Sequence, residues 1–304
     1  MKKIQNNLHY FEISRENPEK LIDDFYVFDE INPEMDKYIQ NTKEIKNILI
    51  TIKTLSDKNE KTEIIDKYFS ELAKIIGKYS NCSEFSCFIN ACDNTIDEAK
   101  KEIAVLKKIA RRYFKKRILN EVVPEEWIQA ILDNNSSRKK GKCGEKKLIH
   151  ILEENDFKQV FEWNDFFNSK FCVVEFSQKF NLKNVRENLD IKIKTKKQNK
   201  TLDLIIKAKN KIFICEAKHL NTSGGGQDKQ ISELIEILSL KEKNDISYIA
   251  FMDGKYSNIL LGDYKRTDTK INTQRKEIKK HLNKNQNNYW LNTEGFKSLI
   301  TDLK

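Results

Sequence analysis

Residues 201–219 read TLDLIIKAKNKIFICEAKH and contain two apolar runs on either side of a polar centre, Lys209-Asn210. Two apolar runs separated by a short polar centre are typical of a β-hairpin. With Lys209 and Asn210 at the turn, Asp203 lies directly opposite Glu216. Residues paired in this way share a face of the hairpin and have neighbouring Cβ atoms. The stretch therefore predicts two carboxylates close together on one face.

Side chains alternate along a strand, so Lys218 shares the face of Glu216. Two adjacent carboxylates repel each other unless a cation lies between them. Magnesium takes oxygen ligands of this kind and completes its shell with water and substrate phosphate. Lys218 would then orient an attacking hydroxide or neutralise charge on a phosphate. The alternative is a half-exposed hairpin whose acidic and basic side chains pair across the strands.

A helix expected shortly before the hairpin carries a further carboxylate. Glu145, Leu148, Ile149 and Leu152 follow helical spacing, so Glu145 is in line with the apolar stripe. A carboxylate on a buried face needs a partner, and a nearby metal site provides one. The alternative is that Glu145 lies at the helix start, where the helix dipole favours it.

The rest of the chain predicts an α/β protein with a helical N-terminal region. We expect residues 1–135 to be mainly helical and residues 136–304 to hold the hairpin and its sheet, with a loop at 133–142 between them. Helical periodicity and β-like runs give the following elements: helices at 37–55, 59–79, 95–119, 227–242, 270–283 and 293–303, and further strands at 171–176, 190–194 and 246–252.

Basic residues are unevenly distributed. Residues 1–100 hold 14 basic and 19 acidic side chains, a net charge of −5, whereas residues 101–150 hold 14 and 6, a net charge of +8. A localised basic region is expected of a protein that binds a polyanion, although a solvated surface is the alternative. The candidate phosphate contacts are Arg111, Arg112, Ser137, Arg138, Lys139, Lys140, Lys142, Gly225, Gln227 and Gln230.

Several classes of protein are disfavoured. No apolar run reaches the ~18 residues that a membrane helix needs, and Lys2 and Lys3 are not followed by the apolar stretch of a secretory signal. The six cysteines form no CxxC pair, so neither a zinc ribbon nor a redox motif is indicated. We therefore expect reduced thiols and a cytoplasmic location.

The combination of Asp203, the Glu216-Ala217-Lys218 tripeptide and an earlier helix with Glu145 resembles the PD-(D/E)xK nuclease superfamily. The EAKH sequence, the glycine-rich loop at 223–227 and the run ISYIAFMDG resemble its type II restriction endonucleases in particular. The resemblance covers about residues 140–265. Leu202 stands where the superfamily name has Pro.

The resemblance implies a restriction-endonuclease-like mixed central sheet flanked by helices. It also implies Mg²⁺-dependent hydrolysis of double-stranded DNA, with Mn²⁺ able to substitute, and commonly a homodimer on a palindrome. Asp203 and Glu216 would be metal ligands, Lys218 the catalytic lysine and Glu145 a catalytic helix carboxylate. A restriction enzyme implies a cognate DNA methyltransferase. The alternatives are a repair, junction or modified-DNA nuclease of the same superfamily and, in another class, a non-catalytic DNA-binding protein.

Overall fold

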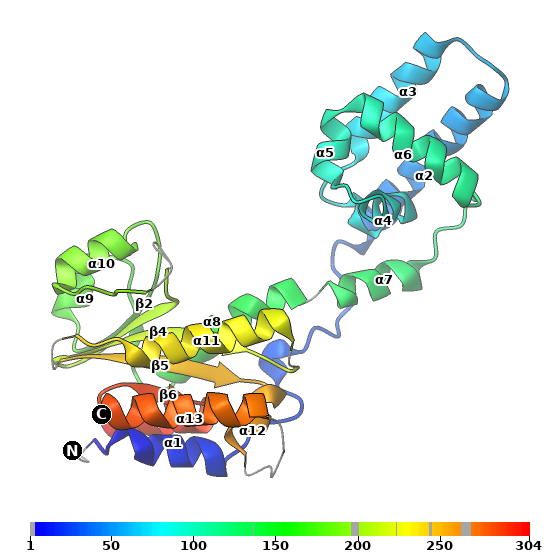
Figure 1. Ribbon diagram of the computed structural model, residues 1–304. Helices are drawn as coiled ribbons and strands as arrows, with labels where there is room; N and C mark the ends of the chain where they lie inside the picture. The colour runs from blue at the N-terminus through cyan, green and yellow to red at the C-terminus, as the bar shows by residue number, and fades with distance from the viewer. Residues whose placement is uncertain (1–3, 136, 196–200, 223, 243–244, 263–268) are drawn as a thin grey trace. The chain divides into compact units, whose positions relative to one another are not determined.

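The structure is a computed structural model that describes residues 4–135, 137–195, 201–222, 224–242, 245–262 and 269–304. The chain forms two compact units. The sheet unit comprises Met1–Val27 and Arg138–Lys304, and the helical unit comprises Phe28–Ser137. In Figure 1 the strands all belong to the sheet unit, and the helical unit carries the light-blue to green helices α2 to α7.

The sheet unit is built on six strands in the order β1-β2-β3-β4-β5-β6. Strands β2, β3 and β4 are antiparallel neighbours, whereas β1 runs parallel to β2, and β5 and β6 continue parallel to β4. The expected mixed sheet is therefore confirmed. The strands are β1 (Lys158–Gln159), β2 (Phe171–Glu175), β3 (Leu204–Ala208), β4 (Lys211–His219), β5 (Ile246–Asp253) and β6 (Tyr289–Leu291).

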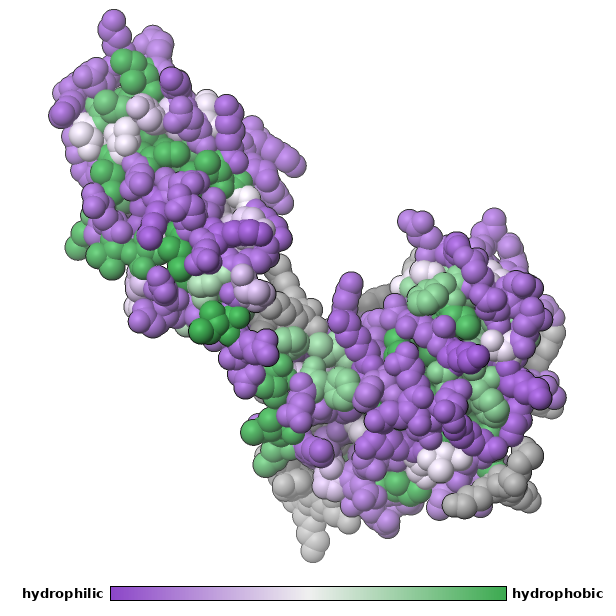
Figure 2. All heavy atoms as spheres, turned by 180° about the vertical axis from the view of Figure 1, so that it is seen from behind, coloured by the Kyte–Doolittle hydropathy of each residue, from purple (hydrophilic) through white to green (hydrophobic). Residues whose placement is uncertain are grey.

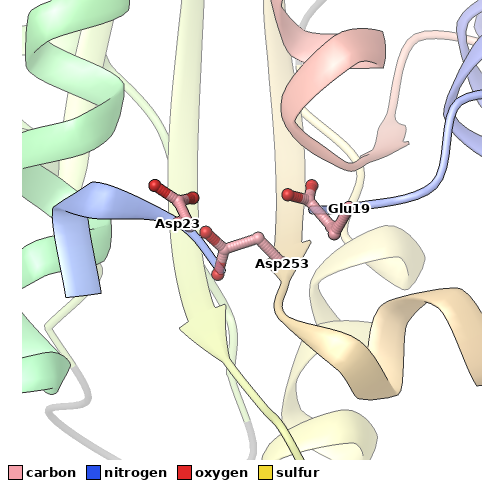
Figure 3. A group of neighbouring side chains, drawn as sticks. All are labelled: Glu19, Asp23 and Asp253. Atoms are coloured by element: carbon pink, nitrogen blue, oxygen red, sulfur yellow. The ribbon is translucent and has the colours of Figure 1, made fainter. Parts of the chain in front are cut away.

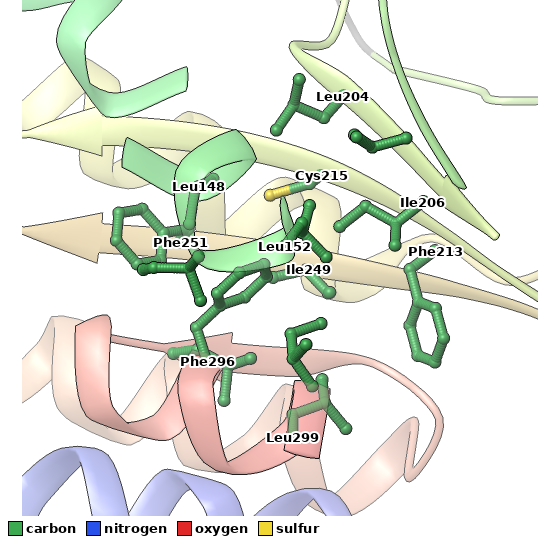
Figure 4. Packing of buried hydrophobic residues seen from close by; sticks show 14 of the residues in the cluster. Leu148, Leu152, Leu204, Ile206, Phe213, Cys215, Ile249, Phe251, Phe296 and Leu299 are labelled. Atoms are coloured by element: carbon green, nitrogen blue, oxygen red, sulfur yellow. The ribbon is translucent and has the colours of Figure 1, made fainter. Parts of the chain in front are cut away.

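Helices cover both faces of this sheet. On one face, Leu148 and Leu152 of α8 and Phe296 of α14 pack on strand residues that include Leu204 and Cys215 (Figure 4). On the other face, α11 contributes buried residues such as Ile231 and Leu234. The helices of this unit are α1 (Asn7–Glu16), α8 (Ser137–Glu153), α9 (Trp163–Asn168), α10 (Leu182–Leu189), α11 (Gly225–Ser239), α12 (Lys255–Leu261), α13 (Thr269–Lys284) and α14 (Thr293–Leu303).

The first 27 residues pack with the sheet unit, whereas the sequence placed them with the helical region. Helix α1 lies against α14 and β6, where Tyr10 is fully buried and its hydroxyl donates to Asp302 Oδ2 at 3.0 Å. A short 3₁₀ helix at Asp24–Tyr26 ends this N-terminal segment. Helix α1 has a weak apolar pattern, so its contacts with residues almost 300 positions later were not apparent from the sequence.

The helical unit has its own buried core, to which α2, α3, α4, α5 and α6 contribute. Hydrophilic side chains cover most of the face of each unit visible in Figure 2. The single helix expected at 95–119 is wrong: Glu102 has an extended conformation and separates α5 from α6. No Gly or Pro marks this break in the sequence. The helices are α2 (Met35–Asp57), α3 (Thr62–Ile75), α4 (Glu84–Ala91), α5 (Ile96–Lys101), α6 (Ile103–Lys116) and α7 (Glu125–Asn134).

Two further expectations near the boundary and the sheet are wrong. The predicted loop at 133–142 is largely helical, because α8 begins at Ser137 and its Arg and Lys residues favour helix despite Gly141. The strand predicted at 190–194 is absent from the described residues. There, Arg186 donates to the carbonyls of Lys192 and Ile193, so side-chain hydrogen bonds replace strand pairing.

Among the helices of the described ranges, none combines the length and apolar character needed to span a membrane.

Candidate active site

The hairpin has the register predicted from its turn. Leu204 pairs with Cys215 and Ala208 pairs with Lys211, and one step further this register places Asp203 opposite Glu216. The backbone of Asp203 is held from both sides: its N–H donates to the Cys215 carbonyl at 3.0 Å, and its own carbonyl accepts from the N–H of Phe176 at 3.1 Å. Asp203 is therefore fixed at the point where β2, β3 and β4 meet.

Three charged side chains converge at this point. Lys218 Nζ lies 2.5 Å from Glu216 Oε1 and 3.9 Å from Asp203 Oδ2. The carboxylate of Asp203 is oriented by the N–H of Ala217, which donates to Oδ2 at 2.7 Å. Glu216 is only 1% exposed, and Cys215 points to the opposite, apolar face of the sheet. The predicted sharing of one face is confirmed.

The lysine of this group is held as a cation. Burial alone would lower the pKa of Lys218, but the nearby carboxylates of Glu216 and Asp203 raise it above its ordinary value. Glu233 of α11 acts in the same direction. Lys218 is therefore an ammonium group that lies near two carboxylates. It can donate hydrogen bonds but does not readily lose a proton.

Glu145 lies on α8 where that helix comes close to β4. A Cβ atom on the preceding Gly144 would come within 3.3 Å of the Tyr26 hydroxyl and 3.8 Å of Ala217 Cβ, so glycine permits this approach. Burial and the negative charges of Asp203 and Glu175 together raise the pKa of Glu145 to about 7, while Lys218 opposes the rise. The pKa of Glu145 therefore depends on the charges of Asp203 and Lys218.

The donor set fits a hard divalent cation. Asp203 and Glu216 present carboxylate oxygens to a common point, and the ammonium of Lys218 supplies positive charge there. Oxygen ligands of this type are those that magnesium prefers. A further carboxylate, Glu145, is close enough for its pKa to depend on Asp203. These residues can hold a metal and place a cation beside a phosphate.

Several candidate phosphate contacts belong to the sheet unit. Lys142 is exposed on α8, and Lys140 lines a surface hollow of about 160 Å³ together with His219. Gly225 begins α11 and is exposed, while Gln227 and Gln230 lie in its first two turns and are half-buried. Gln230 precedes Glu233 by three residues, and Glu233 affects Lys218, so this face of α11 is turned toward the hairpin.

The other candidate phosphate contacts lie in the first turn of α8 and on α6 of the helical unit. Ser137, Arg138 and Lys139 lie in the first turn of α8, but their side chains are outside the described residues. Arg111 and Arg112 belong to the helical unit and are exposed on α6, opposite its buried stripe.

A second acidic cluster was not predicted from the sequence. Glu19, Asp23 and Asp253 bring their carboxylates together at the ends of β4 and β5 (Figure 3). Lys147 of α8 fills this cluster: its Nζ donates to Asp23 Oδ2 at 2.6 Å and to Asp253 Oδ2 at 2.9 Å, and lies 3.5 Å from Glu19 Oε2. Lys147 is only 3% exposed, so these carboxylates and the lysine form a buried ion-pair cluster.

Comparison with known proteins finds a family similar to part of the sheet unit. Residues 146–279 match the Tsp45I type II restriction enzyme family. The match includes Asp203, Glu216 and Lys218 and begins one residue after Glu145. It confirms the resemblance to type II restriction endonucleases. No curated protein and no solved structure matches the chain.

Proposed function

Starting from a sheet unit that matches a type II restriction enzyme family, we propose that this chain is a Mg²⁺-dependent, site-specific endonuclease of double-stranded DNA. The observation that carries the proposal is the convergence of Asp203, Glu216 and Lys218 at the open end of the hairpin. These are the residue types that phosphodiester hydrolysis requires: carboxylates for a metal and a cation for developing negative charge.

The assigned roles follow from the contacts. Asp203, fixed by the Ala217 N–H, and the buried Glu216 would hold the metal, and Mn²⁺ could take the same oxygen ligands. Mg²⁺, when bound, supplies Lewis-acid stabilisation of charge on the phosphate. Lys218 orients the attacking water and neutralises charge on a non-bridging phosphate oxygen. Water attacks phosphorus in line and gives up a proton to the surrounding water, and the bond to the 3′-oxygen breaks as that oxygen takes up a proton from water.

Glu145 is the fourth member of this site. It lies on α8 beside the strand that carries Glu216 and Lys218, and its carboxyl is partly protonated near neutral pH when no metal is present. We assign it to the support of the metal and its water from the helix side. The basic residues of α6 and α8, including Arg111, Arg112, Lys140 and Lys142, contact phosphates.

The partners follow from the substrate. A palindromic site has a two-fold axis, and one chain carries a single Asp203–Glu216–Lys218 set, so two copies cut the two strands. We propose a homodimer, action on DNA in the cytoplasm and a cognate DNA methyltransferase that protects the host sites. An adjacent methyltransferase gene is expected for a restriction enzyme and not for a repair nuclease.

Cleavage of unmethylated plasmid DNA tests the proposal. The full chain is incubated with plasmid and Mg²⁺, and the ends of the fragments are sequenced. Discrete fragments whose ends share one short sequence support a site-specific endonuclease. A non-specific smear, or cleavage only of modified or branched DNA, contradicts it in favour of a repair or junction nuclease. Binding without cleavage contradicts any nuclease assignment.

A further inference from the structure

Asp253, the last residue of β5, is fully buried and both of its oxygens are engaged. Oδ1 accepts a hydrogen bond from Nδ1 of His219 at 2.9 Å. Oδ2 accepts from the Tyr26 hydroxyl at 2.8 Å and from Lys147 Nζ at 2.9 Å. A single carboxylate therefore connects β4, β5, α8 and the N-terminal segment, beside the candidate active site.

The orientation of the His219 ring follows from its other partner. The side-chain oxygen of Asn221 accepts from the N–H of Lys255 at 3.0 Å, so the amide nitrogen of Asn221 faces His219 Nε2 at 3.1 Å. That nitrogen can only donate, which leaves Nε2 as acceptor and puts the imidazole proton on Nδ1, toward Asp253. The ring also stacks on Tyr26 with 3.5 Å between centroids. The ring of His219 is thus held by Asp253, Asn221 and Tyr26.

Gly254 makes this arrangement possible. Its φ is +85°, and a Cβ atom there would come within 2.5 Å of the Leu220 carbonyl oxygen. The chain therefore turns sharply after Asp253, which lets the N–H of Lys255 reach Asn221.

The Asp253 cluster connects the two elements that carry the proposed catalytic residues. Lys147 follows Glu145 by two residues on α8, and His219 directly follows Lys218 on β4. We infer that Asp253 is a positioning residue: by binding Lys147 and His219 together, it sets the spacing between the helix of Glu145 and the strand of Glu216 and Lys218. This inference rests on the proposed function, because it assigns a purpose to the distance across that same site.

Physical chemistry favours a geometric role over a stabilising one. Buried ion pairs contribute little net stability, since the loss of hydration offsets their attraction, and in some proteins they instead fix one arrangement of the groups they join. Catalysis is sensitive to such geometry, and a displacement of about 1 Å can cost on the order of a hundredfold in rate. A cluster that joins α8 to β4 on the side opposite Lys218 can fix the site without contacting the substrate.

Asp253→Asn tests the inference in the full chain. Three quantities are measured: the rate of plasmid cleavage at saturating Mg²⁺, the rise in Tm that Mg²⁺ alone produces, and DNA affinity without divalent metal. We expect the rate to fall by about tenfold or more, the Mg²⁺-dependent rise in Tm to shrink, and DNA affinity to stay unchanged. Wild-type values of rate and Mg²⁺-dependent rise in a folded variant would overturn the inference.

Asn288→Ala is the matched control. Asn288 is buried directly before β6 and contacts the start of β5, where it accepts from the N–H of Tyr248 at 3.0 Å and donates to the carbonyl of Leu240. Its replacement is expected to lower Tm while keeping the cleavage rate and the Mg²⁺-dependent rise. If Asn288→Ala changes the cleavage rate and the Mg²⁺-dependent rise in Tm as Asp253→Asn does, the Asp253 cluster acts only through general stability. The inference then fails.

A milder variant decides the outcome if Asp253→Asn does not fold. Tyr26→Phe removes one hydroxyl donor from Asp253 and keeps the ring that stacks on His219. We expect its cleavage rate to fall by about threefold and its Mg²⁺-dependent rise in Tm to shrink; wild-type values for both would overturn the inference. If the wild-type chain cleaves no DNA, the proposed function fails, whereas the Mg²⁺-dependent rise in Tm still reports on the cluster.

Discussion

The Nζ atom of Lys218 lies 2.5 Å from Oε1 of Glu216, two residues earlier on the same strand. Residues two apart on a strand project from the same face, and here the pair is completed by Asp203 from the neighbouring strand. In the absence of a metal, the positive charge of the Lys218 ammonium offsets the repulsion between the two carboxylates. Once a metal ion binds the two carboxylates, the ammonium of Lys218 is available to interact with a phosphate.

Lys218→Ala is expected to lower cleavage by at least about a hundredfold, because it removes the cation beside the phosphate. The variant should remain folded, with an unchanged far-ultraviolet circular dichroism spectrum. Lys211→Ala, at the exposed start of the same strand, serves as control and should cleave normally. A Lys218 variant that unfolds at ordinary temperature would make the residue structural, and one that cleaves normally would exclude it from the chemistry.

Glu145→Gln should change how stability depends on pH in the absence of divalent metals. Burial raises the pKa of Glu145 from 4.5 to about 7, so the folded chain binds this proton more tightly than the unfolded chain. The resulting stability is fully present below about pH 4.5 and is lost as the pH rises from there to about 7. Glutamine resembles the protonated form, so the Tm of the variant should exceed that of wild type above pH ~7 and match it below pH ~4.5. A difference in Tm that does not vary with pH would contradict the raised pKa.

DNA binding should depend steeply on salt. The logarithm of the binding constant falls by about 0.9 per neutralised phosphate for each decade of salt, and several contacts per subunit predict a slope steeper than about −3. Charge reversal at Arg111 and Arg112 should reduce both the slope and the affinity for all sequences alike. Reversal at Lys58 and Lys61, also exposed in the helical unit, is the control and should change neither. An unchanged slope in the arginine variant would assign α6 to a solvated surface.

The chain is expected to be a homodimer at equilibrium, with the helices at 37–79 as the interface. This segment lies within the acidic first hundred residues, so it suits contact with another protein chain better than contact with DNA. Ile64 of α3 is 42% exposed, and Ile64→Glu should weaken the dimer. Sedimentation equilibrium with and without specific DNA measures the oligomeric state of the wild-type chain and of the Ile64→Glu variant. A monomer in either condition that nicks one strand at a time would contradict the prediction.

The candidate site could be predicted from the sequence because its geometry is local. The hairpin turn at Lys209-Asn210 fixes the register, and the register alone brings Asp203 opposite Glu216. The helical period of Leu148 and Leu152 correctly predicts the buried face of α8, since periodicity depends only on neighbouring residues. Short-range rules were sufficient for the hairpin and this helix.

The Asp253 cluster could not be predicted in this way. Tyr26, Lys147, His219 and Asp253 are separated by up to 227 positions in the chain, and no periodicity connects them. The sequence alone indicates that Lys147 is an ordinary solvent-facing lysine. Its role depends on the carboxylates of Glu19, Asp23 and Asp253, which the fold brings around it. The sequence does show that Lys218 and His219 alternate in direction along β4, but what His219 meets on its side depends on tertiary packing.

The central claim is that Asp203, Glu216 and Lys218 cleave DNA with a divalent metal, and Glu216→Gln tests it most directly. The variant keeps the shape of a side chain that is 1% exposed and removes one charged ligand oxygen. Cleavage of unmethylated plasmid in Mg²⁺ is compared with wild type and with Glu187→Gln, an exposed position on α10. We predict that the Glu216 variant binds DNA as well as wild type or better and produces no fragments, while the Glu187 variant cleaves normally. Cleavage by Glu216→Gln at more than about a few per cent of the wild-type rate would contradict the account.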